Sequence, residues 1–175
     1  VDLLNDVVDE CNDYGDWPQM FRETTATVSS SVESYEIVVS GQMKNVYEMH
    51  FDTDISPLRS VGVDEMRRLQ RARIFGRPRH FANVDVSGAN QKVRLSPIPG
   101  ANENNKALSI AFYKKQRIFA TVTADSTAVV LFPGRMLVQG TYAKALLEES
   151  GQQETPQYKV AYQEYVNMRK EAYNR

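Results

Sequence analysis

The sequence has very few of the residue types that usually mark a chemical function. Its 175 residues include one cysteine and two histidines. A single cysteine excludes a disulfide framework and a cysteine-rich zinc site. His50 and His80 lie too far apart in the chain to suggest a compact metal site. No run approaches the roughly 18 apolar residues of a membrane-spanning helix.

The chain also lacks an excess of charge of either sign. Its formal net charge is −1 and its pI is about 6.2, whereas a dedicated nucleic-acid-binding domain typically has a pI above about 9. With 42% hydrophobic residues, nine glycines and seven prolines, it is too apolar for a disordered chain. The length suits one domain, so we expect residues 1–175 to form a single domain.

The hydrophobic pattern predicts helices at both ends of the chain and strands between them. Leu4, Val7, Val8 and Cys11 recur at helical spacing and predict a helix within residues 1–14. Residues 17–122 form a β-rich middle that favours a small antiparallel sheet or sandwich. We expect strands at residues 21–29, 35–39, 46–51, 81–86, 93–95, 108–113 and 118–122, and one inserted helix over residues 63–74.

The C-terminal part, residues 133–175, predicts a helical hairpin. One apolar stripe comprises Met136, Leu137, Gly140, Ala143 and Leu147, and a second, rich in tyrosine, runs from Tyr158 to Tyr173. Thr155 followed by Pro156 is a typical helix start, with a hydroxyl N-cap before proline. The predicted fold class is therefore α+β.

No strong catalytic motif is present. Asp52 and Asp54 have a spacing that can hold a divalent cation, but such a pair at the end of a strand is more typical of a turn. Cys11 lies on the apolar stripe of the first helix, where burial raises the pKa of a thiol and makes it unreactive. Phosphate-binding and nucleophile-elbow motifs are absent. The sequence thus predicts no enzyme activity, cofactor or metal.

The layout of charge is more informative. Residues 59–79 contain seven arginines against Asp64 and Glu65, and residues 1–20 contain six acids and no base. Arginine suits contact with carboxylates or phosphates, so we select Arg67, Arg68, Arg71 and Arg73 as candidate interface residues. The alternative is a solvated helix face that pairs with carboxylates of the same chain.

Tyrosines are concentrated in the last helix. Four of the nine lie there, and a tyrosine stripe suits an interface that stays wet at its edge. We select Tyr162, Tyr165 and Arg169 as candidate contacts of this helix. The alternative is ordinary packing of the helix on its own domain.

The order of several short motifs resembles the head-to-tail adaptor proteins of tailed bacteriophages. An acidic helix containing cysteine is followed by Asp16-Trp17-Pro18 and by threonine-rich strands. Proline then precedes an aromatic residue at a strand start, in the segment 77–81, where the family's tyrosine is Phe81. Paired prolines at 97 and 99, the strand at 108–115 and the terminal hairpin complete the likeness.

The resemblance implies a structural virion protein without catalytic activity. Such adaptors form a ring, commonly of twelve copies, between the portal protein and a tail or nozzle protein at the neck of the virion. Double-stranded DNA passes through the ring without specific binding, and the subunits assemble in the host cytoplasm. One alternative is a neck or tail-completion protein one layer below. Another is a virion-associated cell-wall hydrolase, for which Asp52, Asp54 and Glu65 are the candidate carboxylates.

Overall fold

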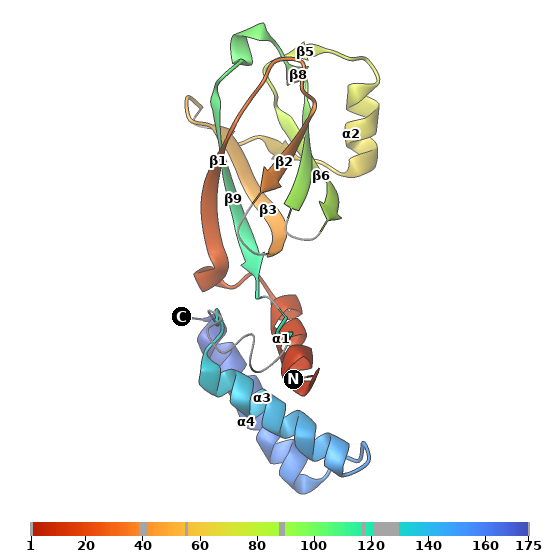
Figure 1. The fold of residues 1–175 in the computed structure, drawn as a ribbon, viewed down its shortest axis with the longest axis vertical. Helices are drawn as coiled ribbons and strands as arrows, with labels where there is room; N and C mark the ends of the chain where they lie inside the picture. Colours follow the sequence, from red (N-terminus) through yellow and green to blue (C-terminus); the bar gives the residue numbers. More distant parts are fainter. Residues whose placement is uncertain are drawn as a thin grey trace. The chain divides into compact units, whose positions relative to one another are not determined.

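The computed structural model describes residues 2–38, 42–54, 56–87, 90–116, 118–120 and 130–174. The chain divides into two compact units. The helical unit comprises residues 1–20 and 116–175, and the β unit comprises residues 21–115. Helices and antiparallel-rich sheets together make the fold α+β, as the sequence predicts (Figure 1). Within the described residues, no helix is long and apolar enough to cross a membrane.

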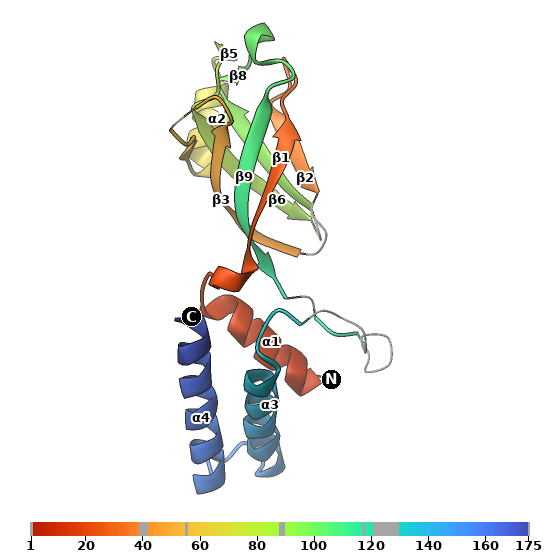
Figure 2. The same ribbon diagram turned by 90° about the vertical axis from the view of Figure 1, so that its left-hand side faces the viewer.

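The helical unit consists of the N-terminal helix and the C-terminal hairpin. α1 (Asp2–Tyr14) packs against α3 (Gly134–Glu149), and α3 packs against α4 (Pro156–Tyr173), as Figure 2 shows. A short 3-10 helix, η1 (Pro18–Met20), follows α1. Among the described residues of this unit, the buried hydrophobic side chains are Val7, Val8, Cys11, Trp17, Met20, Phe132, Met136, Leu137, Ala143, Ala161 and Tyr165.

Local sequence explains the start of α4. The Thr155 hydroxyl accepts a hydrogen bond from the Tyr158 backbone N–H at 3.2 Å, with Pro156 in the first turn. An N-cap hydroxyl satisfies a helix N–H that has no partner within the helix, and proline at this position has no N–H to satisfy. The predicted helix start is thus confirmed.

The β unit is built on two sheets. β1 (Phe21–Thr27), β9 (Ala107–Lys115) and β3 (Gln42–Phe51) form a three-stranded antiparallel sheet in that order. The second sheet has the order β2-β7-β6-β4, with only the short β4–β6 pairing parallel. Its strands are β2 (Ser34–Val38), β7 (Asn90–Ser96), β6 (His80–Ser87) and β4 (Arg59–Ser60).

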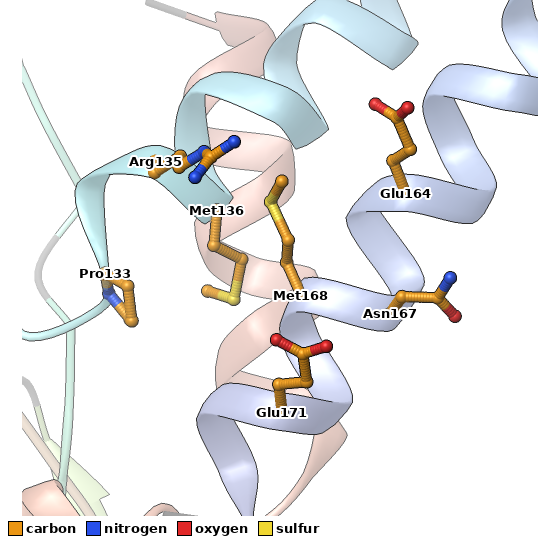
Figure 3. A pocket seen from close by; sticks show the side chains of 7 residues that line it. All are labelled: Pro133, Arg135, Met136, Glu164, Asn167, Met168 and Glu171. Atoms are coloured by element: carbon orange, nitrogen blue, oxygen red, sulfur yellow. The ribbon is translucent and has the colours of Figure 1, made fainter.

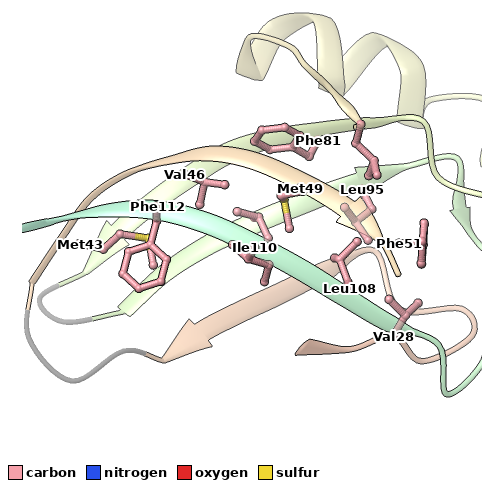
Figure 4. Close-up of a cluster of buried hydrophobic side chains, with 12 residues drawn as sticks. Val28, Met43, Val46, Met49, Phe51, Phe81, Leu95, Leu108, Ile110 and Phe112 are labelled. Atoms are coloured by element: carbon pink, nitrogen blue, oxygen red, sulfur yellow. The ribbon is translucent and has the colours of Figure 1, made fainter. Parts of the chain in front are cut away.

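The hydrophobic core of the β unit follows the period of two along each strand (Figure 4). In β9, Leu108, Ile110 and Phe112 are buried, while the residues between them are more exposed. In β6, Phe81 joins this core, and its neighbour Ala82 packs with Met66 of α2 (Val63–Gln70) instead. α2 therefore covers part of the sheet face that points away from the core.

Two details differ from the prediction. The helix predicted over residues 63–74 ends at Gln70. Arg73 adopts a left-handed conformation (φ 45°), and the chain then enters β5 (Phe75–Gly76), which pairs in parallel with β8 (Ile98–Pro99). Pairing with β8 keeps this segment extended. β8 leads into η2 (Ala101–Glu103). Residues 118–120 are not part of a strand, and the rest of the predicted strand 118–122 lies outside the described residues.

Candidate protein-interaction surfaces

The four candidate arginines lie in one exposed segment of the β unit, which we name the arginine patch: Arg67, Arg68, Arg71 and Arg73. α2 supplies the first two in its last turn. Arg67 lies 3.3 Å from Asp64, but both side chains are more than half exposed, at 67% and 86%. Such an exposed pair contributes little. Among the described residues, the other three arginines form no ion pair.

Two exposed apolar side chains follow the arginine patch directly, and we call them the tip. Ile74 is 59% exposed and Phe75 is 58% exposed. Their backbone is held in place, because Ile98 N–H donates to the Ile74 carbonyl at 2.9 Å and Gly100 N–H donates to the Gly76 carbonyl at 3.1 Å. Sequence reasoning missed the tip, although two large apolar residues between Arg73 and a Gly-Arg-Pro segment were a visible signal.

Arg77 has a different role from the arginine patch. Its guanidinium pairs with Asp54, donates to Thr53 Oγ1 at 2.9 Å and lies 5.4 Å from the Phe51 ring centroid. These contacts tie the turn after β3 to the segment that precedes β6.

The three carboxylates considered for cation binding or hydrolysis each lie in a different environment. Asp52 accepts a hydrogen bond from Ser109 Oγ at 2.6 Å, Asp54 pairs with Arg77, and Glu65 lies exposed in the first turn of α2. His50 Nδ1 lies 3.6 Å from Glu48 Oε1. No group of three or more His, Cys, Asp or Glu side chains among the described residues is placed to hold a metal ion.

The candidate residues of α4 lie in or beside the core of the helical unit. Tyr165 is buried, with its hydroxyl 3.3 Å from Cys11 Sγ. The Arg169 side chain is only 11% exposed, pairs with Glu10 and lies 4.3 Å from the Tyr14 ring centroid. Both residues thus pack within their own unit.

Tyr162 occupies an intermediate position. It is half-buried and stacks on Tyr158 with ring centroids 5.5 Å apart and planes at 22°. Its other neighbour is the Tyr165 ring, at 6.0 Å. Of the three candidates on α4, Tyr162 is the one at the rim of the core.

Burial keeps Cys11 of α1 and Tyr165 of α4 protonated where their side chains meet. It raises the pKa of the Cys11 thiol, and the hydrogen bond between Cys11 and Tyr165 offsets this only in part. Burial also raises the pKa of the Tyr165 hydroxyl, and the contact with Cys11 raises it further. Both groups are therefore neutral near pH 7, which makes Cys11 a poor nucleophile.

The helical unit presents three surface features of its own. Exposed carboxylates of α1 form an acidic stripe: Asp2, Asp6, Asp9 and Asp13. Their spacing of four, three and four residues places them on one helix face. A groove of about 470 Å³ lies between α3 and α4. Figure 3 shows its lining, where Met136 and Met168 lie among Arg135, Glu164 and Glu171. A second groove, of about 350 Å³, lies between α1 and α3 and is almost wholly apolar.

Net charge differs in sign between the two units. The helical unit has 12 acidic and 7 basic residues, giving −5, and the β unit has 10 acidic and 14 basic residues, giving +4. The net charge of −1 is the sum of these opposite values. Fold and surfaces together describe a two-unit α+β protein with exposed features suited to contact with other macromolecules.

No protein-family model matches this chain, and no curated protein matches it either.

Proposed function

We propose that this chain is a structural protein of a tailed-bacteriophage virion, and that it forms the head-to-tail adaptor ring between portal and tail. The order of motifs described above supports this assignment. They are the acidic helix with its Trp-Pro segment, the threonine-rich strand, the paired prolines and the terminal hairpin. In this role the chain has no catalytic activity and needs no cofactor.

The opposite charge of the two units is the observation that carries the assembly role. A closed ring of identical subunits needs a heterologous contact, in which two different faces of the subunit are complementary. Here the β unit carries +4 with its arginine patch exposed, and the helical unit carries −5 with an exposed acidic stripe. Faces of opposite charge favour head-to-tail association over self-facing pairs.

The mechanism is assembly rather than chemistry. Each copy packs beside the next, binds the portal protein on one side of the ring and presents a platform for a tail or nozzle protein on the other. Twelve copies enclose a channel for double-stranded DNA. A subunit with a net charge of −1 suits a conduit, because a strongly basic lumen would hold the DNA that has to move through it. The site of action is the neck of the virion, after assembly in the host cytoplasm.

Native mass spectrometry tests the proposal. The full chain is measured alone and after mixing with a portal protein of the same virion. We expect a ring of defined copy number bound to the portal. A chain that stays monomeric in both samples would overturn the adaptor assignment. Binding to tail components but not to the portal would instead favour the neck or tail-completion protein.

A further inference from the structure

The tip lies at the end of the β unit where β5 and β8 pair (Figure 1). Ile74 directly precedes Phe75 of β5, and the Ile74 carbonyl accepts a hydrogen bond from the Ile98 N–H of β8. In extended backbone, successive side chains point to opposite sides, yet both of these side chains are more than half exposed. A segment lying flat on the unit would cover one of them. The tip is therefore an apolar wedge that is accessible from two sides.

The backbone beneath the wedge is held in place by β8 and the residue after it. Gly100 N–H donates to the Gly76 carbonyl at 3.1 Å, and a Cβ on Gly100 would lie 3.4 Å from the Gly76 Cα, so the two segments approach closely. A fixed backbone removes much of the entropic cost of ordering a segment when it binds. Large apolar side chains presented in this way are typical of an interaction site.

The surroundings of the tip are positively charged. Residues 66–84 contain six arginines and no acidic residue. Arg71 and Arg73 precede the tip, both exposed and without an ion pair among the described residues. η2 packs beside β5, and its one carboxylate, Glu103, has a side chain only 7% exposed that pairs with Lys106 at 2.9 Å. The tip therefore suits a partner that is negative at its surface and apolar beneath it.

An anionic phospholipid bilayer has this layered chemistry. Its headgroup phosphates attract arginine, and the boundary with the acyl chains accepts apolar side chains on both sides of a wedge without a shaped recess. The apolar stem of arginine lets the guanidinium stay at the phosphates while neighbouring side chains go deeper. Double-stranded DNA offers the negative charge, but it admits an apolar wedge only when base pairs are unstacked, which costs energy.

We infer that the tip inserts Ile74 and Phe75 into the interfacial region of an anionic phospholipid bilayer, with Arg71 and Arg73 at the headgroup phosphates. Two inserted side chains give a shallow and reversible contact, in which apolar burial and charge attraction both contribute. The inference goes beyond the proposed function and does not rest on it, because it assigns the tip a lipid partner rather than a contact between copies.

Cosedimentation of the full chain with vesicles tests the contact. The vesicles contain equal parts of phosphatidylcholine and phosphatidylglycerol, and vesicles of phosphatidylcholine alone are the neutral comparison. We expect binding to the anionic vesicles only. Ile74→Ser with Phe75→Ser should weaken this binding about tenfold or more. Val160→Ser is the matched control, because Val160 is 63% exposed on α4, and it should bind as the wild type does. Circular dichroism checks that each variant is folded.

A charge comparison separates the arginine patch from net charge. Arg71→Gln with Arg73→Gln should weaken binding to the anionic vesicles about tenfold. Arg135→Gln with Lys170→Gln is the control, because it removes the same two charges from exposed positions of the helical unit. We expect this control to lose less than about twofold. Equal losses in the two variants would show that net charge alone drives binding, and the inference would be wrong.

Fluorescence reports insertion directly. The chain has one tryptophan, Trp17, which is buried. In Phe75→Trp, a second indole replaces the ring at the tip. Anionic vesicles should shift its emission to shorter wavelength, and lipids brominated in their acyl chains should quench it. The wild type, with Trp17 only, is the control for both signals. Vesicle binding without this shift and quenching would contradict insertion of the tip.

The outcomes keep this inference apart from the proposed function. A wild type that does not bind anionic vesicles, or a tip variant that binds them as well as the wild type, overturns the inference and leaves the adaptor role standing. If the tip variant instead loses binding to double-stranded DNA while no chain binds vesicles, the wedge is a DNA-contact element and the inference fails. A wild type that binds vesicles through the tip but stays monomeric with the portal supports the inference and overturns the proposed function.

Discussion

Arg169 shows how single side chains join the two ends of the chain within the helical unit. Its guanidinium pairs with Glu10 of α1 and lies over the rings of Tyr14 and Tyr165, 4.3 Å and 5.1 Å from their centroids. Lys144 of α3 adds a second cation 3.7 Å from Glu10. Removing one member of a mostly buried ion pair leaves the other uncompensated. The network therefore positions α1 against both helices of the hairpin.

Cys11 and Tyr165 make the stability of the helical unit sensitive to high pH. Both groups have a raised pKa in the folded state, caused mainly by burial. Above pH 9.0, the ordinary pKa of a thiol, the unfolded chain loses protons that the folded chain retains. The unfolded state then binds fewer protons, so the free energy of unfolding falls as pH rises.

We therefore expect the free energy of unfolding of the wild type to be constant between pH 7 and 8 and to fall above about pH 9. Urea denaturation followed by circular dichroism at each pH measures it. Tyr165→Phe with Cys11→Ala should reduce the slope above about pH 9, even though the variant is less stable at pH 7. An unchanged slope would show that other groups control the alkaline loss of stability.

Gly140 lies where α3 packs tightly against side chains of α1 and α4. A Cβ at this position would lie 2.7 Å from Val7 Cγ1 and 2.9 Å from Tyr165 Cε2. We expect Gly140→Ala to lower the free energy of unfolding by about 1–3 kcal/mol, because overpacking displaces both neighbours. Gly134→Ala is the control, since nothing lies within 4 Å of its Cβ position. The control should be neutral or stabilising by up to about 1 kcal/mol in the same denaturation experiment.

At the scale of elements, α1 is also a scaffold for the chain that follows β9. Asn12 Nδ2 donates to the Gln116 carbonyl at 3.1 Å, and Asn12 Oδ1 accepts from the Gln116 N–H at 2.9 Å. Asn5 repeats this two-bond pattern with the backbone of Phe119, at 2.9 Å in both directions. The two asparagines are seven residues apart and so lie on one side of the helix.

Asn12→Ala should release this segment. Both backbone groups of the buried Gln116 would lose their hydrogen bonds to Asn12, which costs about 1–3 kcal/mol of unfolding free energy. Hydrogen exchange provides the specific readout, because the amide of residue 116 should exchange markedly faster in the variant. Asn167→Ala, at an exposed position of α4, is the control and should change stability by less than about 0.5 kcal/mol. Unaltered exchange at residue 116 would contradict the scaffold role of Asn12.

Elements fixed by local sequence were predictable, and those fixed by distant partners were not. The start of α4 follows from Thr155 and Pro156 alone. The end of α2 does not, because the extended backbone at Ile74 depends on hydrogen bonding with Ile98, more than twenty residues later. The tyrosine stripe was visible in the sequence, but the meeting of Tyr165 with Cys11 requires contact between opposite ends of the chain. The exposure of the tip depends on the same β5–β8 pairing.

At the scale of the whole molecule, the net charge is near zero because the two units carry opposite charges. A net charge of −1 combines a −5 helical unit with a +4 β unit. In the proposed ring, these opposite net charges favour attraction between unlike units of different copies. Association driven in this way depends on ionic strength, whereas association by apolar surfaces alone does not weaken with salt.

Self-association of the full chain should therefore weaken as sodium chloride rises from about 0.05 to 0.5 M, because the screening length falls from somewhat more than 10 Å to a few ångströms. We expect a loss of about tenfold in the association constant, equal to about 1.4 kcal/mol. Sedimentation velocity at each salt concentration measures it. The variant Arg71→Gln with Arg73→Gln should have weaker association at low salt and a flatter salt dependence, because it has lost two of the charges that salt screens. Association that strengthens with salt would show that apolar contacts dominate and that the opposite charges of the units serve another partner.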